Sequence, residues 1–495
     1  MTLTAFLRST FFTARSRLWR RSCEPTAFRG EKTRKLPPNK LFLAAAILPL
    51  AGCSTLHYEV NPPIKMVEPE VGYRLQRFID TEPEDHMFMQ VTVSGGGARA
   101  ATLGYGVLEE LKATRVHWDG KHERLIDDLD VLMGVSGGSM LTAAVALNGI
   151  DSLERFESDF LSATLQDDFK SRLLRPSNLW RITSPNFGRS DALERFLDQR
   201  LYRGATFGDI SRTPRKPFAV IYATDMVTGG RFEFVQDQFD FLCSDLSQVK
   251  LARAVAASSA VPLVLSPITI WNHSADANEA GCGEPTVKRA AARLGVQSRR
   301  LAELDGYKEQ RKGELRRPFI HLIDGGLADN VNARGAADYI AQFGSLANGA
   351  RFAGYRGLRR MVFIVVNAET SARSPEDRSP HVPGPLRTAL ALADIPINRN
   401  SSAALTQMRA TVDNWKEEVR SAHARSDYSV FAPDIQFFVI EVNLTAAGDA
   451  ELSERLQAIP TTLQLTPEEV SALRQHARIQ LRSSPDYQHL LQQLH

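Results

Sequence analysis

Residues 130–140 read Asp-Val-Leu-Met-Gly-Val-Ser-Gly-Gly-Ser-Met, a pattern that predicts a strand, a sharp turn and a helix. Within it, Gly134 and Gly138 frame Ser136 as G-x-S-x-G. A strand that turns directly into a helix forces its bend residue toward positive φ and crowds neighbouring backbones, so glycines on either side remove clashes. The helix N-terminus behind the serine favours developing negative charge. We interpret Ser136 as a candidate nucleophile; the alternative is a Gly/Ser loop before a buried helix.

A second strand and helix precede this stretch, and three glycines join them. Residues 87–93 have the composition of a buried strand, and residues 99–112 place apolar side chains on one face of a helix. Gly95, Gly96 and Gly97 lie between them. Consecutive glycines leave several backbone N–H groups able to point in one direction, and such a nest binds an anion or an oxyanion.

The same glycines fit a competing interpretation. Gly95-x-Gly97-x-x-Ala100 after a strand also matches the fingerprint of dinucleotide-binding folds. That motif requires an acidic residue at the end of the next strand, about 20 residues further on. Asp119 has the right spacing but lies in a polar turn, and the next strand leads to Ser136. The oxyanion interpretation is therefore favoured.

A third strand end carries a carboxylate. Residues 319–326 read Phe-Ile-His-Leu-Ile-Asp-Gly-Gly, which predicts a buried strand ending at Asp324. Acyl transfer needs a hydroxyl, a base within hydrogen-bond reach and donors for the oxyanion, and these strand ends supply one of each. His321 competes for the role of base, but residues three apart in a strand face opposite ways. We expect His321 to be a buried, hydrogen-bonded side chain further down the strand.

Four motifs in this order make the chain similar to the patatin-like phospholipase family: Gly95-Gly96-Gly97-Ala98-Arg99, Gly134-Val135-Ser136-Gly137-Gly138, Ala257-Ser258-Ser259-Ala260-Val261-Pro262 and Asp324-Gly325-Gly326. The resemblance implies an α/β class, namely a three-layer α/β/α fold with a mainly parallel central sheet, over residues 86–370. It also implies lipid acyl hydrolysis by a Ser136–Asp324 dyad, with Gly95 to Gly97 as the oxyanion hole and Arg99 bracing that loop. Ala100 departs from the family, which usually has glycine there.

Two other classes of function remain open at this point. A Ser-His-Asp esterase would need a histidine downstream of its acid, and His381 and His423 are available, although neither follows a strand. A catalytically inactive lipid-binding homologue is the other alternative.

The first 52 residues predict a targeting segment. A basic leader precedes an apolar run at residues 41–51, which is too short to span a bilayer. Leu50-Ala51-Gly52-Cys53 resembles the lipobox of bacterial lipoproteins, which implies lipidation of Cys53 and a membrane anchor. Ser54 would by resemblance direct the protein to an outer membrane. Residues 53–85, with four prolines, are expected to form a tether.

Composition limits the remaining partners. Residues 1–52 contain ten Lys/Arg and two Asp/Glu, whereas residues 53–495 contain 50 basic and 55 acidic side chains, so no basic face suggests nucleic acid. The eleven histidines show no metal-ligand spacing, and no cofactor is expected. We interpret residues 272–317 as an insertion, which is a solvated surface loop, a lid or a membrane-facing loop. We expect Cys243 and Cys282 to pair and tie it to the core. Residues 371–495 are expected to be a mainly helical extension packed on the core; the oligomeric state stays open.

Overall fold

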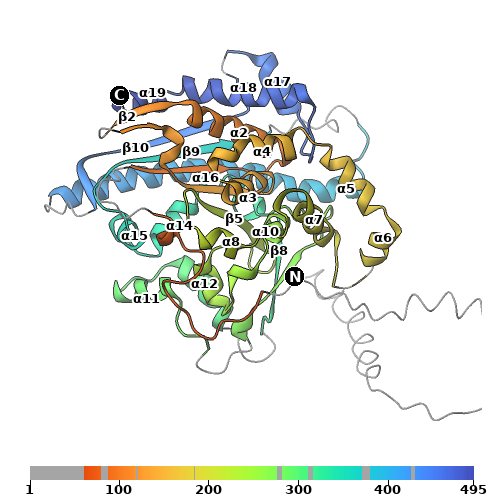
Figure 1. The fold of residues 1–495 in the computed structure, drawn as a ribbon, viewed down its shortest axis with the longest axis horizontal. Helices are drawn as coiled ribbons and strands as arrows, with labels where there is room; N and C mark the ends of the chain where they lie inside the picture. The colour runs from red at the N-terminus through yellow and green to blue at the C-terminus, as the bar shows by residue number, and fades with distance from the viewer. Residues whose placement is uncertain are drawn as a thin grey trace, which may run out of the picture. The chain divides into compact units, whose positions relative to one another are not determined.

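A mixed sheet runs through the part of the chain that the structure describes (Figure 1). Its eight strands lie in the order β10 (Phe431–Asn443), β9 (Leu358–Asn367), β1 (Met87–Val93), β4 (Leu129–Val135), β5 (Phe218–Asp225), β8 (Phe319–Ile323) and β7 (Ile268–Trp271), with β6 (Arg231–Glu233) beside β5. The first five are mutually parallel. β6, β7 and β8 are antiparallel to their neighbours. The predicted α/β class with a mainly parallel central sheet is confirmed.

The structure is a computed structural model. It describes residues 61–79, 87–118, 121–182, 184, 186–275, 281–309, 316–370, 380–424, 430–446 and 448–494. The expected targeting segment and the candidate lipidation site Cys53 lie outside these residues. Within them, no helix combines the length and the apolar character needed to cross a bilayer.

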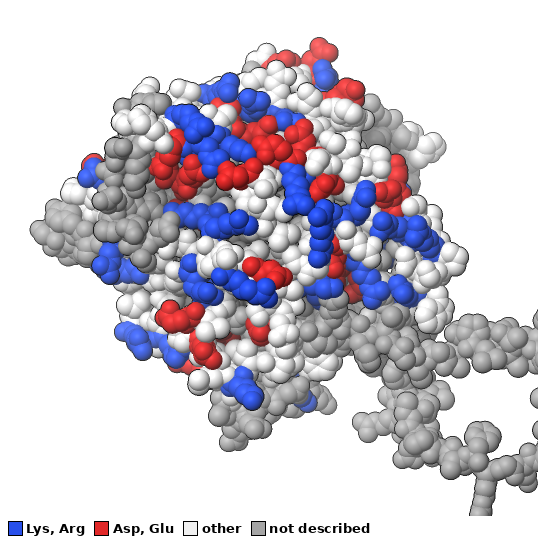
Figure 2. Space-filling view, viewed as in Figure 1, with Lys and Arg blue, Asp and Glu red and all other residues white. Residues whose placement is uncertain are grey.

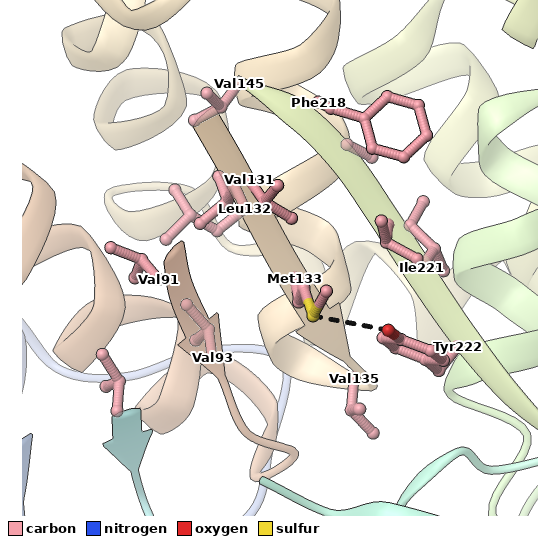
Figure 3. Packing of buried hydrophobic residues seen from close by; sticks show 14 of the residues in the cluster. Val91, Val93, Val131, Leu132, Met133, Val135, Val145, Phe218, Ile221 and Tyr222 are labelled. Atoms are coloured by element: carbon pink, nitrogen blue, oxygen red, sulfur yellow. Dashed lines mark hydrogen bonds between the residues drawn. The ribbon is translucent and has the colours of Figure 1, made fainter. Parts of the chain in front are cut away.

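The central strands are buried along their whole length. Every residue of β1, β4 and β5 is buried. Such strands read as continuous apolar runs because helices cover both faces of the sheet. Figure 3 shows the packing at the centre, where the Tyr222 hydroxyl of β5 lies 3.4 Å from the Met133 sulfur of β4. This rigid centre positions the strand ends that carry the site.

Helices form a layer on each face. On one face, α2 (Gly97–Ala113) packs on Val93, α3 (Gly137–Asn148) packs on β4, and α10 (Leu251–Ser258) packs on β5. On the other face, the ring of Trp415 in α16 (Pro385–Ala424) lies 5.9 Å from that of Phe363, and Gly335 of α14 (Gly335–Ala341) lies against Met133 and Tyr222. The result is a three-layer α/β/α arrangement.

The C-terminal segment lies on the first of these helical layers. α18 (Pro467–Ser483) packs along α2, and α19 (Pro485–Gln493) packs on β10. The remaining helices and hairpin strands are β2 (Arg115–Trp118), β3 (Lys121–Arg124), α4 (Leu153–Phe156), α5 (Leu165–Leu173), α6 (Pro176–Ile182), α7 (Arg189–Leu197), α8 (Phe207–Arg212), α9 (Gln236–Phe239), α11 (Thr286–Arg293), α12 (Arg299–Glu309), α13 (Gly326–Asp329), α15 (Leu346–Ala353) and α17 (Ala450–Ala458).

The expected tether is wrong for residues 61–79, which pack on the core. Tyr73 is fully buried, and its hydroxyl donates to the carbonyl of Ala219 at 2.9 Å. The Arg74 guanidinium binds Asp240 at 2.9 Å and Asp237 at 2.5 Å. The prolines suggested an extended linker, but aromatic and paired charged side chains between them hold this segment against the fold.

The expected insertion at residues 272–317 is also more ordered than a loop. It contains α11 and α12, and Val287, Leu301 and Leu304 from these helices are buried. The sequence of this region is polar overall, and the few apolar residues that anchor each helix are too sparse to predict one. Strand β7 and the hairpin formed by β2 and β3 were not predicted either.

Candidate active site

Ser136 occupies the bend between β4 and α3. Its φ is 49° and its ψ is −118°, a strained conformation that non-glycine residues rarely adopt. A Cβ at Gly134 would stand 2.4 Å from the Thr142 hydroxyl, and a Cβ at Gly138 would stand 2.3 Å from the carbonyl oxygen of Val93. Both glycines are therefore required for the elbow to pass so close to α3 and β1. Ser136 itself is 9% exposed.

The structure brings Ser136 and Asp324 together. Asp324 follows β8, and its carboxylate accepts hydrogen bonds from the Ser136 side chain and from the Gly326 amide, the latter at 2.8 Å. Burial raises the pKa of Asp324 to about 6, although both hydrogen bonds oppose the rise. A carboxylate with a pKa of about 6 is a far better base than an exposed aspartate.

Ser258 connects the nucleophile to the base. The Ser136 amide donates to the Ser258 hydroxyl at 2.8 Å, and the Gly325 amide donates to the Ser258 carbonyl at 3.1 Å. The Asp324 amide donates to the carbonyl of Ala260 at 3.0 Å. The end of α10 thus fixes both partners of the dyad. This segment is one of the four family motifs, but its sequence alone indicates no role for Ser258.

The glycine loop supplies fewer free donors than expected. The Gly95 amide donates to the carbonyl and the side-chain oxygen of Asn330, at 3.2 and 3.1 Å, so it is not available for an oxyanion. Among the described residues, the amides of Gly96 and Gly97 donate to no acceptor. Their φ values of 137° and 62° are accessible to glycine and strained for other residues. The expected role of Gly95 in the oxyanion hole is therefore revised: it anchors the loop to Asn330.

A third amide joins this pair. Gly137 begins α3 directly after Ser136, and its N–H also has no acceptor within the described part of the chain. The position follows from the elbow, because the first N–H groups of a helix have no partner within the helix. Among the described residues, the amides of Gly96, Gly97 and Gly137 are thus without an acceptor, and Gly137 directly follows Ser136.

Arg99 braces the glycine loop from behind, through the C-terminal segment. Its guanidinium donates to the carbonyls of Ala368 (3.1 Å) and Ile459, and to the hydroxyl of Thr461 at 3.3 Å. Burial lowers the pKa of Arg99 to about 10. The Ala98 amide donates to the carbonyl of Thr462 at 2.7 Å. This contribution of residues 459–462 could not be read from the motifs, because these residues are about 360 positions away in the sequence.

The competing interpretations receive no support from this geometry. Ala100 is buried within α2, where a methyl group fits the helix. α2 leads into the β2–β3 hairpin and then into β4, so the next strand of the sheet leads to Ser136 and not to the acidic residue of a dinucleotide site.

His321 is half-buried, its Nδ1 lies 3.0 Å from the Thr269 hydroxyl, and burial lowers its pKa. The hydrogen bond agrees with the structural role expected for His321, but the side chain is less buried than expected.

Two further histidines are the candidate bases of a Ser-His-Asp mechanism. His381 is exposed, and His423 lies near the end of α16. Both have contacts elsewhere in the protein. Within the described residues, no group of three or more His, Cys, Asp or Glu side chains has the arrangement of a metal site.

Cys243 and Cys282 form a disulfide in the structure, with a Cα–Cα distance of 5.6 Å. Both cysteines are buried against Val67. The Val67 amide donates to the Cys282 carbonyl at 2.9 Å, and the Ile64 amide donates to the Cys243 carbonyl at 2.9 Å. The pair therefore joins the segment before α11 both to the core and to residues 61–79.

A family model matches the part of the chain that contains the four motifs. Residues 91–337 match the family model described as patatin-like phospholipase. No curated protein matches the chain significantly. Among solved structures, human GIVD cytosolic phospholipase A2 is 12% identical, with a TM-score of 0.38 over 85% of this chain and 64% of that one. VipD from Legionella pneumophila is 12% identical, with a TM-score of 0.27 over 89% of this chain and 75% of that one. The chain thus spans less than two thirds of the length of the human enzyme.

Proposed function

Because residues 91–337 match the family model described as patatin-like phospholipase, we propose that the protein is a serine-dependent lipid acyl hydrolase of the phospholipase A or lysophospholipase type. One observation carries the proposal: the Ser136 hydroxyl, on a strained elbow, is hydrogen-bonded to a buried carboxylate whose pKa is raised to about 6. Neither strain nor burial of a carboxylate stabilises the fold, so their combination points to a chemical role.

In the proposed reaction, Asp324 removes the proton from the Ser136 hydroxyl as the oxygen attacks the ester carbonyl. The carbonyl carbon becomes tetrahedral and its oxygen negative. Collapse of this intermediate breaks the bond to the alcohol, which leaves with the proton held by Asp324. Water then attacks the acyl-enzyme, with Asp324 as the base again, and releases the fatty acid and free Ser136.

The negative oxygen would be stabilised by the amides of Gly96, Gly97 and Gly137. They are supported as donors by their lack of acceptors among the described residues and by the contact between the two loops that carry them. One donor of this kind typically contributes on the order of 10²–10³ in rate. Arg99 acts as a positioning residue, because it holds the loop and is itself bound to main-chain carbonyls.

Hydrolysis of a soluble short-chain ester tests the proposal. The wild-type protein should hydrolyse it, whereas Ser136→Ala and Asp324→Asn should each lose a factor on the order of 10³ or more in kcat/KM. His321→Gln and His381→Gln are the matched controls and should stay near wild type. If a histidine variant were inactive while Asp324→Asn kept its activity, a Ser-His-Asp mechanism would replace this one. No hydrolysis by the wild type would favour an inactive homologue.

We also propose that Cys53 carries a lipid anchor and that the protein is an outer-membrane lipoprotein. The support is the sequence Leu50-Ala51-Gly52-Cys53 after an apolar run, followed by Ser54. Such an anchor would hold the protein at a membrane, where a lipid acyl hydrolase meets its substrate.

A further inference from the structure

Helix α6 (Pro176–Ile182) has no buried residue, although it carries large apolar side chains. Leu179 is 47% exposed and Trp180 is 55% exposed. In Figure 1, α6 lies at the periphery of the protein beside α5 and α7. A short exposed helix gains little from propensity alone, so apolar side chains on it indicate a surface that acquires a partner.

Two loops add apolar side chains with similar exposure. Met226 and Val227 directly follow β5, and Leu263 and Val264 lie five and six residues after the end of α10. All four are between 48% and 66% exposed. Leu263 has a φ of +71°, a conformation that disfavours leucine. The fold therefore holds this side chain outward at an energetic cost, which suggests a role for its exposure.

These three segments meet at one place. Ile182, Arg189 and Met226 line the same hollow, together with Ser266 and His321. The Arg189 guanidinium donates to the carbonyl of Leu263 at 2.8 Å. We call the six exposed side chains the apolar rim: Leu179, Trp180, Met226, Val227, Leu263 and Val264.

Two of the segments that form the apolar rim also contain residues that contact the candidate active site. Leu263 is only three residues from Ala260, whose carbonyl accepts the Asp324 amide, and five from Ser258, whose hydroxyl accepts the Ser136 amide. Met226 follows the strand β5, in which Tyr222 pairs with Val135, the residue before Ser136. A surface that covered the rim would thus lie close to the dyad.

The segments around the rim carry more basic than acidic side chains, although the acidic Asp191 also lines the hollow. Residues 169–190 contain five basic and no acidic side chains, and residues 254–275 contain no acidic side chain. Arg175, Arg181 and Arg189 make no ion pair with any other described residue, and Arg175 and Arg189 are exposed. On the side of the molecule where Figure 1 places α6, Figure 2 shows uncharged surface with basic and some acidic side chains around it. This contrasts with the net negative charge of residues 53–495.

We propose that the apolar rim and its arginines are the surface with which the protein docks on an anionic phospholipid bilayer. The proposal rests on the proposed function and adds the substrate surface to it. Apolar side chains would enter the interface, and the arginines would contact lipid phosphates. Docking there would present the mouth of the site to the ester bonds of the outer lipid layer.

Vesicle binding by full-length Cys53→Ser protein, with and without the rim substitutions, tests this, because the two unlipidated chains keep the same residues 1–52 and differ only at the rim. The vesicles are phosphatidylcholine alone and phosphatidylcholine with phosphatidylglycerol. The variant Trp180→Ser/Leu263→Ser should bind the anionic vesicles about tenfold or more weakly, since two apolar side chains no longer enter the interface. Ile479→Ser is the matched control, because Ile479 of α18 is also 55% exposed. It should bind like the parent.

Activity separates this inference from the proposed function. The rim variant should hydrolyse a soluble short-chain ester at the parent's rate but lose hydrolysis of anionic vesicles in parallel with binding. Equal binding by parent and rim variant, or no preference for anionic vesicles, would overturn the docking proposal while ester hydrolysis still stood. Self-association of the parent that is lost in the rim variant, without vesicle binding, would overturn it in favour of a second copy of the chain. If the parent did not hydrolyse the soluble ester, the proposed hydrolase activity would be refuted. The docking proposal would then be tested by the vesicle-binding result alone.

Discussion

Gly137 lies directly against Gly97, so that a Cβ on Gly137 would stand 2.0 Å from the main-chain oxygen of Gly97. The residue after the candidate nucleophile is thereby locked to the loop that carries two of the three free amides. We predict that Gly137→Ala pushes the two loops apart, lowers kcat/KM for a soluble ester by about 10²-fold or more, and destabilises the fold by about 1–3 kcal/mol.

Gly306→Ala is the control for that substitution. Gly306 lies in α12, and a Cβ there would meet nothing within 4 Å. This variant should keep full activity and gain slightly in stability, because alanine favours a helix by up to about 1 kcal/mol over glycine. Wild-type activity in Gly137→Ala would show that the contact between the loops is not needed for catalysis.

The buried carboxylate of Asp324 predicts a trade-off between stability and activity. Its pKa rises from 3.8 to about 6 on folding, so the folded state binds the proton more tightly than the unfolded state does. This group's contribution is therefore most favourable below about pH 4, and it is lost as the pH rises through about 6. Asp324→Asn removes the buried charge, and should be more stable than wild type at pH 8 by up to about 3 kcal/mol.

Urea unfolding at two pH values measures this effect. The difference between Asp324→Asn and wild type should be large at pH 8 and should nearly disappear at about pH 3, which is below the pKa of the carboxyl in both states. A variant that is less stable than wild type at pH 8 would mean that Asp324 holds the fold together, and its loss of activity would then need no catalytic explanation.

The sequence predicted the strands whose ends carry chemistry because each is a largely apolar run that is soon followed by glycine. Ser136 and Asp324 were predicted as site residues from the glycines beside them, and the structure places the two side chains in hydrogen-bond contact. The sequence could not predict that the Gly95 amide donates to Asn330. That hydrogen bond depends on how the chain after α13 returns to the first strand. The hold of Ile459 and Thr461 on Arg99 is likewise a tertiary contact with no local signal.

A similar limit explains the two errors at residues 61–79 and 272–317. Prolines and polar composition indicate irregular chain, but Tyr73 and Leu301 are buried because partners from other segments enclose them. Buried residues in short or polar segments carry no period long enough to recognise.

The disulfide between Cys243 and Cys282 is predicted to stabilise the mature protein. The two residues are 39 positions apart, and closing a loop of that length contributes about 4 kcal/mol by chain entropy. Cys243→Ser/Cys282→Ser should lower the free energy of unfolding by a comparable amount. Peptide mapping without reductant should yield one linked pair of peptides; two free thiols at these positions in the mature protein would contradict the pairing.

The candidate lipobox predicts how the precursor is processed. Cys53→Ser should give a chain that is neither cleaved by lipoprotein signal peptidase nor labelled by a radioactive fatty acid, because the thiol that carries the lipid is absent. Its mobility on a gel should match the precursor and not the mature form. Normal processing of this variant would refute the anchor and leave an ordinary signal peptide in its place.

Covalent labelling by a fluorophosphonate probe tests the dyad most directly, because the probe reacts with an activated serine and needs no knowledge of the natural lipid. The account predicts one label per chain, located on Ser136 by peptide mass spectrometry. The labelling rate should rise with pH to a plateau above about 6, as Asp324 loses its proton. Asp324→Asn should label at least about 10²-fold more slowly, while His321→Gln labels like wild type. Label on another serine, or a rate unchanged by Asp324→Asn, would contradict the Ser136–Asp324 dyad.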